Sequence, residues 1–166
     1  DWVGGELLAG VGLVVIESGP GMRTFASFTW PGLVGAVTGM NDAGLSVADL
    51  MAYPGGSRRP RPGRPVLFVV RSLLEQAGSV DQALNLLREQ KRTMPQNYAL
   101  ADKASAAMVE TAPDHFRPRP ARSGLHGITN FFNEDRATKP GGRYVRLFAA
   151  AADGPGLPGV SPYGVR

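Results

Sequence analysis

The sequence contains no cysteine among its 166 residues. Disulfide bonds, thiolate metal sites and a cysteine nucleophile are therefore excluded within these residues. Histidine is almost as scarce, because His115 and His126 are the only two. A zinc site built on them would need carboxylate ligands as well. We expect neither a metal nor another cofactor.

No apolar run approaches the roughly 18 consecutive residues of a membrane-spanning helix. No signal-peptide pattern opens the chain, although Asp1-Trp2 is an unlikely natural start and the true N-terminus is expected to lie upstream. The sequence thus assigns no compartment, with the cytoplasm as the default, and we expect no association with a membrane.

The formal net charge of +4 comes from one short stretch. Four arginines lie in a Pro- and Gly-rich segment, and without them the formal charge is zero: Arg58, Arg59, Arg61 and Arg64. No aromatic residues alternate with them to stack on bases. A solvated connector is therefore favoured over a nucleic-acid surface.

Hydrophobic residues make up 43% of the chain and charged residues 19%, which is typical of a globular protein. The length fits one domain, predicted over residues 1–152, with a Gly/Pro-rich tail over 153–166. The 22 glycines and 14 prolines indicate frequent turns.

Extended segments are predicted in the first third of the chain. They cover residues 7–17, 23–30, 33–40 and 45–53, each followed by a turn or loop. Some of them are apolar on both faces, which indicates a sheet covered on both sides.

Two helices follow a loop over residues 54–65. The first begins near Pro65 and ends at Gly78, with an apolar stripe at helical spacing. Ser79 and Gln82 form a capping box that begins the second helix, over residues 80–92. We interpret both apolar stripes as core.

Strands are predicted again at 97–102, 104–111 and 121–130, and a last helix at 142–152. The order of strands, helices, strands and helix favours an α+β fold over regular βαβ alternation. Dinucleotide and P-loop phosphate motifs and the serine nucleophile elbow are all absent. Composition and periodicity by themselves therefore indicate a soluble α+β domain.

Four short strings carry more information. They are Asp1-Trp2, residues 39–47 (GMNDAGLSV), Ile128-Thr129-Asn130 and residues 142–146 (GRYVR). Their order and spacing resemble the penicillin acyltransferase and choloylglycine hydrolase group of N-terminal-nucleophile hydrolases, over roughly residues 1–150. The helical stretch looks closest to the acyl-coenzyme A:6-aminopenicillanic acid acyltransferase-like branch. This resemblance implies a four-layer αββα sandwich of two mainly antiparallel sheets.

Members of that group cut their own chain before a cysteine, whose freed α-amino group then activates the thiol. The resemblance implies an amidohydrolase or acyltransferase that acts on linear amide bonds of a small-molecule amide or acyl donor. The cysteine would lie upstream of Asp1, so residues 1–166 by themselves are expected to be inactive. Whether the protein forms a homo-oligomer is left open by the resemblance.

The resemblance also implies three catalytic residues. Asp1 would orient the nucleophile, Asn130 would donate its side-chain N–H to the oxyanion, and Arg143 would steady the active-site carboxylate. We expect them to converge on one concavity. The alternatives are a solvated terminal residue, an asparagine that turns the chain and a surface arginine.

Three further residues are assigned to substrate binding: Met51, Tyr53 and Phe131. Met51 stands where the choloylglycine branch has a second oxyanion asparagine, which moves the prediction away from bile-salt hydrolysis. Phe131 stands where relatives near the acyltransferase branch often have histidine. The competing hypothesis is a degenerate homologue or binding module that keeps the fold without the chemistry.

Overall fold

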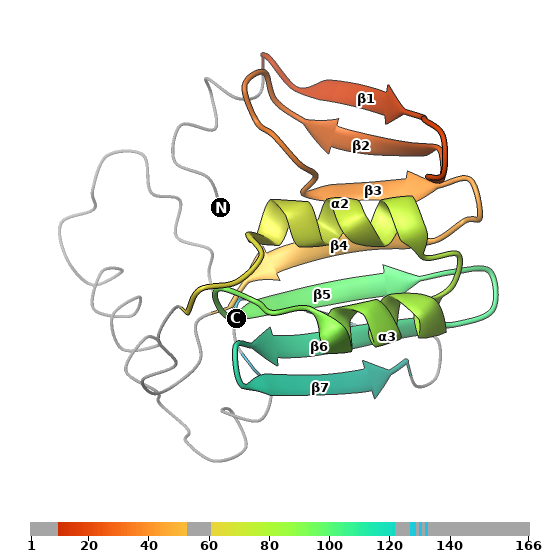
Figure 1. Cartoon of the computed structure of the whole chain (residues 1–166). Coiled ribbons are helices and arrows are strands. Elements are labelled where there is room, and N and C mark those ends of the chain that lie inside the picture. The colour runs from red at the N-terminus through yellow and green to blue at the C-terminus, as the bar shows by residue number, and fades with distance from the viewer. Residues whose placement is uncertain (1–9, 53–60, 122–126, 129, 131, 133–166) are drawn as a thin grey trace, which may run out of the picture.

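The computed structural model describes residues 10–52, 61–121, 127, 128, 130 and 132 (Figure 1). These residues contain seven strands and two helices. The elements are β1 (Leu13–Glu17), β2 (Phe25–Thr29), β3 (Thr38–Asn41), β4 (Ser46–Met51), α2 (Val66–Gln76), α3 (Val80–Glu89), β5 (Gln96–Ala101), β6 (Ala106–Ala112) and β7 (His115–Pro120).

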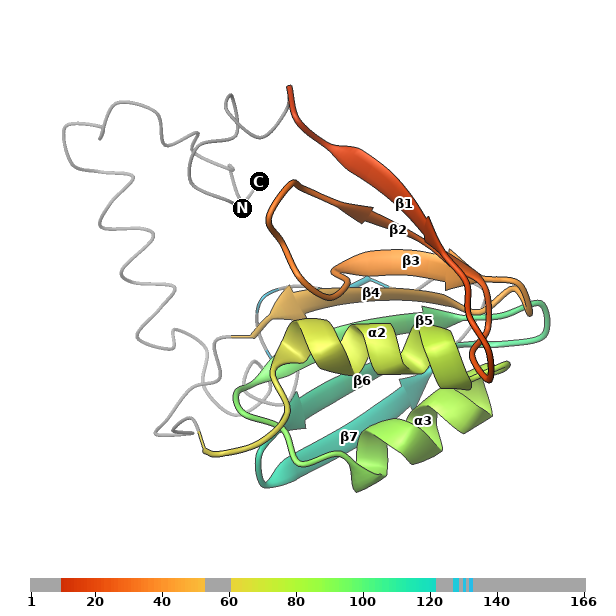
Figure 2. The same cartoon turned by 45° about the horizontal axis from the view of Figure 1, so that its top comes forward.

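The seven strands form one antiparallel sheet in which the spatial order is the chain order. The helices are inserted between β4 and β5, which nevertheless pair directly over six residue pairs. Both views show α2 and α3 side by side on the same face of this sheet (Figures 1 and 2). The described residues therefore make two layers, a sheet and a helix layer.

The two helices lie where the sequence predicts them. Ser79 is the N-cap of α3, and its side chain accepts a hydrogen bond from the backbone N–H of Gln82 at 3.3 Å. The Gln82 side chain in turn accepts from the backbone N–H of Gly78 at 2.7 Å. The capping pair therefore satisfies backbone donors at the start of the helix.

Strand residues on the helix side form the main core with α2 and α3. Alternation in β2 places Phe25, Ser27 and Thr29 on the buried side. Val47, Tyr98 and Val109 continue this side on the following strands and are at most 1% exposed. We call the opposite side of the sheet the open face.

The α+β class and the antiparallel pairing are confirmed. The assignment of the strands to two sheets is corrected for the described residues. The pairing of β4 with β5 joins the strands before the helices and the strands after them into one sheet. The helices cover one face of it, whereas Val14, Ile16 and Met40 on the open face are 71%, 73% and 55% exposed. One sheet and one helix layer correspond to half of an αββα sandwich.

Three strand assignments also differ from prediction. The segment predicted at 33–40 forms a strand only from Thr38, as β3. Strand β7 was not predicted. Its Pro118 and Pro120 are tolerated because β7 lies at the edge of the sheet formed by the described strands. The strand predicted at 121–130 is absent at the described positions, and the chain bends at Asn130.

Two hairpin turns bind the helices to the sheet. The buried Asn41 side chain donates to the carbonyls of Leu74 and Ala77 at the end of α2, at 3.0 and 2.6 Å, and accepts from the N–H of Leu45 at 3.1 Å. In the β5–β6 turn, Asp102 accepts from the N–H of Val80 at the start of α3, at 2.7 Å. These backbone hydrogen bonds hold the pKa of Asp102 below its usual value.

The end of α3 is held in the same way. Arg92 is 8% exposed, and its guanidinium donates to the carbonyls of Leu87 and Gln90 at the end of the helix. It also donates to the carbonyls of Ala112 and His115, which flank the β6–β7 turn. At the ends of both helices, side chains thus donate hydrogen bonds to backbone carbonyls that would otherwise be buried without a partner.

Replacement of Asn41 by alanine tests the first of these connections. We expect Asn41→Ala to lower the free energy of unfolding by about 2–4 kcal/mol, because it leaves two carbonyls and one N–H without their partner. Urea denaturation followed by circular dichroism measures this. Asn85→Ala, which removes an exposed bond to Arg88, is the matched control and should change stability by less than about 0.5 kcal/mol. An equal loss of unfolding free energy in the two variants would show that the bonds from Asn41 to α2 do not stabilise the fold.

Candidate functional site

Two of the six predicted site residues lie in the described part of the chain, and the structure brings them together. The side-chain Nδ2 of Asn130 donates to the backbone carbonyl of Met51 at 2.9 Å, although the two residues are 79 positions apart. Met51 ends β4 and its side chain is 45% exposed. Asp1, Tyr53, Phe131 and Arg143 lie outside the described residues.

The bond to Met51 uses one of the two N–H groups of the Asn130 amide. Because an amide is planar, this bond also fixes the direction of the second N–H. Asn130 is therefore held by its own side chain at the end of β4. Such a fixed donor is the element that oxyanion stabilisation requires.

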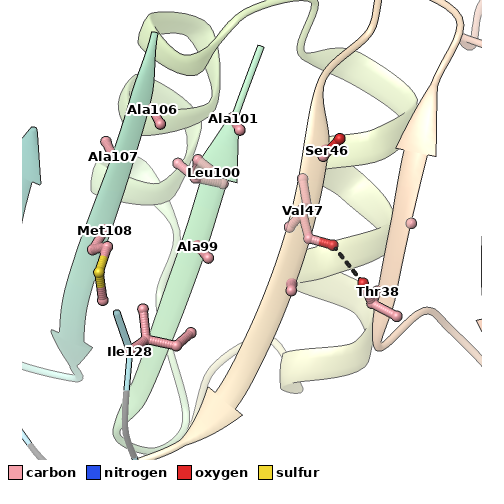
Figure 3. A pocket seen from close by; sticks show the side chains of 12 residues that line it. Thr38, Ser46, Val47, Ala99, Leu100, Ala101, Ala106, Ala107, Met108 and Ile128 are labelled. Carbon is pink, nitrogen blue, oxygen red and sulfur yellow. Dashed lines mark hydrogen bonds between the residues drawn. The ribbon is translucent and has the colours of Figure 1, made fainter. Parts of the chain in front are cut away.

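Neighbours of Asn130 lie against the open face. Ile128 lies beside Ala99 and Met108 (Figure 3). Phe132 is fully buried with Ala52 and Ala112, and its ring stacks on His115 with centroids 5.2 Å apart. These contacts place Asn130 between two apolar anchors at one end of the sheet.

A hollow of about 270 Å³ lies on the open face beside Ile128 (Figure 3). Its floor consists mainly of small residues. They include Gly39, Ser46, Ala48, Ala99, Ala101 and Ala106. Thr38 closes one side and donates its hydroxyl to the carbonyl of Val47 at 3.1 Å. The hollow is thus shallow, mostly apolar and continuous with the residues that precede Asn130.

Polar side chains lie between the two anchors on the same face. Asn97 and Glu110 are opposite each other on β5 and β6 and are 2% and 1% exposed. Arg119 on β7 makes an ion pair with Glu110, with Nη2 and Oε1 3.2 Å apart. None of these three residues was predicted to belong to the site, because their burial depends on pairing between distant strands.

A partly buried carboxylate, that of Asp49, lies on the opposite, helix-covered side of the sheet. Burial raises the pKa of Asp49 from its usual 3.8 to about 6. Its Oδ1 is buried without a hydrogen-bond partner among the described residues. Its cross-strand neighbour is Tyr98, whose pKa is raised by burial and by the charge of Asp49. An acidic residue at a core-facing position of an apolar strand was a signal in the sequence that could have identified it.

Within the described ranges, no three His, Asp or Glu side chains gather in a way that could hold a metal ion. Of the helices there, none is both long enough and apolar enough to cross a membrane.

Comparison with known proteins gives one family. The model of the acyl-coenzyme A:6-aminopenicillanic acid acyl-transferase family matches residues 5–146. An uncharacterized protein from Archaeoglobus fulgidus is 25% identical over 118 residues, which cover 69% of this chain and 20% of that protein. The chain therefore spans about a fifth of the length of this relative.

Solved structures show the same fold at low identity. The Caenorhabditis elegans ortholog of N-acylethanolamine-hydrolyzing acid amidase superposes with a TM-score of 0.61 at 18% identity, covering 86% of this chain and 67% of that one. Penicillin V acylase from Agrobacterium tumefaciens superposes with a TM-score of 0.50 at 19% identity, covering 86% and 46%. Both likenesses support the N-terminal-nucleophile hydrolase fold.

The partly buried carboxylate of Asp49 makes the stability depend on pH. Its folded pKa is raised, so the protonated form is favoured by folding, and stability is lost as the pH rises from about 4 through 6. We expect Asp49→Asn to stabilise the protein at pH 8 by about 1–2 kcal/mol, less than the full shift implies because the side chain is partly exposed. At pH 4 the gain should vanish.

Urea denaturation at the two pH values measures this difference. Asp81→Asn, which removes an exposed carboxylate from α3, controls for the loss of one negative charge. A gain from Asp49→Asn that is the same at both pH values would show that its ionisation is not the cause.

Proposed function

Because the chain belongs to the acyl-coenzyme A:6-aminopenicillanic acid acyl-transferase family, we propose that it is part of an enzyme that hydrolyses a linear amide or transfers its acyl group. The substrate would be a small-molecule amide or acyl donor. By their names, one of the similar structures is the ortholog of an amidase that hydrolyses N-acylethanolamines and the other is an acylase of penicillin V, which supports this substrate class.

The proposed nucleophile is the thiol of an N-terminal cysteine outside residues 1–166, freed by self-cleavage. Its α-amino group takes the thiol proton, and the sulfur attacks the amide carbonyl carbon to form a tetrahedral oxyanion. The C–N bond then breaks, the amine leaves with the proton, and an acyl-thioester remains. Water or a second amine attacks this thioester and regenerates the thiol.

One observation carries the proposal: the side-chain bond from Asn130 to the carbonyl of Met51. The second N–H of this amide would donate to the oxyanion of the tetrahedral intermediate. A donor of this kind contributes about 3 kcal/mol to the stability of the transition state when it is aimed in advance. The bond to Met51, which fixes the plane of the amide, supports this role.

Two further residues complete the proposed machinery. The carboxylate of Asp1 would orient the nucleophile or its α-amino group, and the guanidinium of Arg143 would hold that carboxylate by charge-assisted hydrogen bonds. Tyr53 and Phe131 are proposed to line the substrate pocket. The assignments of Asp1 and Arg143 rest on positions that match the family's motifs, whereas Phe131 stands where relatives often have histidine.

A binding module without catalysis is the second candidate. The absence of cysteine from residues 1–166 favours it. The sequence immediately before Asp1 in the gene distinguishes the two. A cysteine about twenty residues upstream, with an arginine three residues before Asp1, supports the enzyme.

Replacement of Asn130 by alanine tests the catalytic role directly. In the full-length, self-cleaved protein, we expect Asn130→Ala to lower kcat for an acyl amide by about a hundredfold with an unchanged melting temperature, because it removes the oxyanion donor. Asn85→Ala, on the exposed side of α3, should leave kcat unchanged. Normal turnover by the Asn130 variant would remove this residue from the site.

The proposed source of the thiol makes a separate prediction. A preparation of residues 1–166 should release no amine from any acyl amide, since the chain offers no cysteine. The full-length protein should be active and should lose its activity after alkylation with iodoacetamide. Turnover by residues 1–166, or turnover that survives alkylation, would overturn the thiol mechanism.

A further inference from the structure

The side chain of Phe132 fills a small space at one end of the sheet. It is fully buried and shares an apolar cluster with Ala52 and Ala112, which are 4% and 0% exposed. Its ring also stacks on that of His115, with centroids 5.2 Å apart and an angle of 22° between the planes. Stacked rings attract each other beyond the effect of burial, so the stack holds Phe132 in one orientation.

Two of the residues that contact Phe132 are themselves fixed by the backbone around them. Ala112 and His115 pair with each other across the β6–β7 turn. Arg92 donates to the carbonyls of both, from Nε at 3.1 Å and from Nη2 at 3.3 Å. The ring of His115 therefore belongs to a hairpin whose backbone is held by a guanidinium, and the stack has a rigid base.

Ala52, the third contact of Phe132, belongs to the same peptide unit as the carbonyl of Met51. The N–H of this unit donates to the carbonyl of Pro95 at 3.3 Å, while its carbonyl accepts from Nδ2 of Asn130 at 2.9 Å. Because a peptide unit is planar, its donor and its acceptor keep a fixed relation to each other. Phe132 and Asn130 thus both act on one rigid group.

Phe132 and Asn130 are also tied to each other through the chain. Two positions along a chain span at most about 7 Å between Cα atoms, so a fixed Phe132 limits how far Asn130 can move from β4. Two residues before Asn130, Ile128 lies beside Met108 on the open face (Figure 3). Asn130 therefore reaches the carbonyl of Met51 from a position that is limited on both sides.

We propose that Phe132, stacked on His115, is a positioning residue that aims the amide of Asn130. The stack keeps the Phe132 ring against Ala52. Asn130 then stays within reach of the Met51 carbonyl and is bound there through Nδ2. Loss of the stack frees the amide from this carbonyl, so that its N–H groups lose their set direction. The effect on catalysis rests on the proposed function, whereas the effect on the Asn130 amide does not.

Nuclear magnetic resonance of the full-length protein, made with isotope-labelled asparagine, tests the positioning without any measurement of activity. Asn130→Asp removes the side-chain amide and so identifies its signals. In the wild type, we expect one Nδ2 proton to exchange with water about tenfold more slowly than in free asparagine, because it is bound to the Met51 carbonyl. His115→Ala should remove this protection.

Phe28→Ala is the matched control. It also removes one ring of an aromatic pair, that of Phe28 with Trp30 (centroids 5.4 Å apart), but the pair begins on β2. The exchange of the Asn130 amide should be unchanged in this variant. Wild-type exchange of that amide in His115→Ala would overturn the positioning role. If His115→Ala does not fold, Phe132→Leu, which keeps an apolar side chain without the ring, decides the question by the same measurement.

Kinetics separate this inference from the proposed function. If the wild type is active, His115→Ala should lower kcat about tenfold with little change in KM, because an oxyanion donor acts on the transition state rather than on the bound substrate. His115→Phe keeps a ring for the stack and should restore kcat to within about twofold of the wild type. In the Asn130→Ala background, His115→Ala should add little to the loss.

Three kinetic outcomes have distinct meanings. Wild-type kcat in His115→Ala would contradict the inference. Equal losses in His115→Ala and His115→Phe would also contradict it, because the imidazole and not the stack would then be the group that matters. An inactive wild type would contradict the proposed function, while exchange of the Asn130 amide would still decide the role of Phe132.

Discussion

The guanidinium of Arg92 joins the end of α3 to the β6–β7 hairpin. Its donors reach four backbone carbonyls, and burial lowers its pKa without removing its charge. One of these carbonyls belongs to His115, whose ring stacks on Phe132. Phe132 in turn anchors the residues around Asn130 on the sheet. A series of contacts thus joins the end of α3 to Phe132, two residues after Asn130.

The two faces of the sheet differ in the groups that they present. On the helix side, Asn41, Asp102 and Arg92 bind hairpin turns to helix ends, and the apolar core fills the space between. On the open face, Asn130 is bound at the end of β4, the hollow beside Ile128 lies over the first residues of β4 and β6 and the last residues of β5, and the Glu110–Arg119 pair joins β6 to β7. This separation keeps the groups proposed for catalysis away from those that hold the layers together.

Prediction from sequence succeeded where the signals are local. The capping residues Ser79 and Gln82 and the apolar stripe of α2 act within a few positions, so both helices were correctly located. It failed where a strand depends on its neighbours. Strand β7 contains two prolines and forms because β6 supplies a partner on one side and no strand is needed on the other. The single sheet required the pairing of β4 with β5 across the inserted helices.

The sequence by itself determined the family resemblance, the two helices and the choice of Asn130 as a candidate site residue, because each depends on short motifs. Only the tertiary structure decided that the side chain of Asn130 donates to the carbonyl of Met51. It also decided that the side chain of Asn41 caps the carbonyls at the end of α2, and that Glu110 is buried beside Arg119. These outcomes depend on contacts between residues far apart in the chain. Periodicity and motif spacing carry no record of such contacts, since side chains meet across a sheet only after its strands have paired.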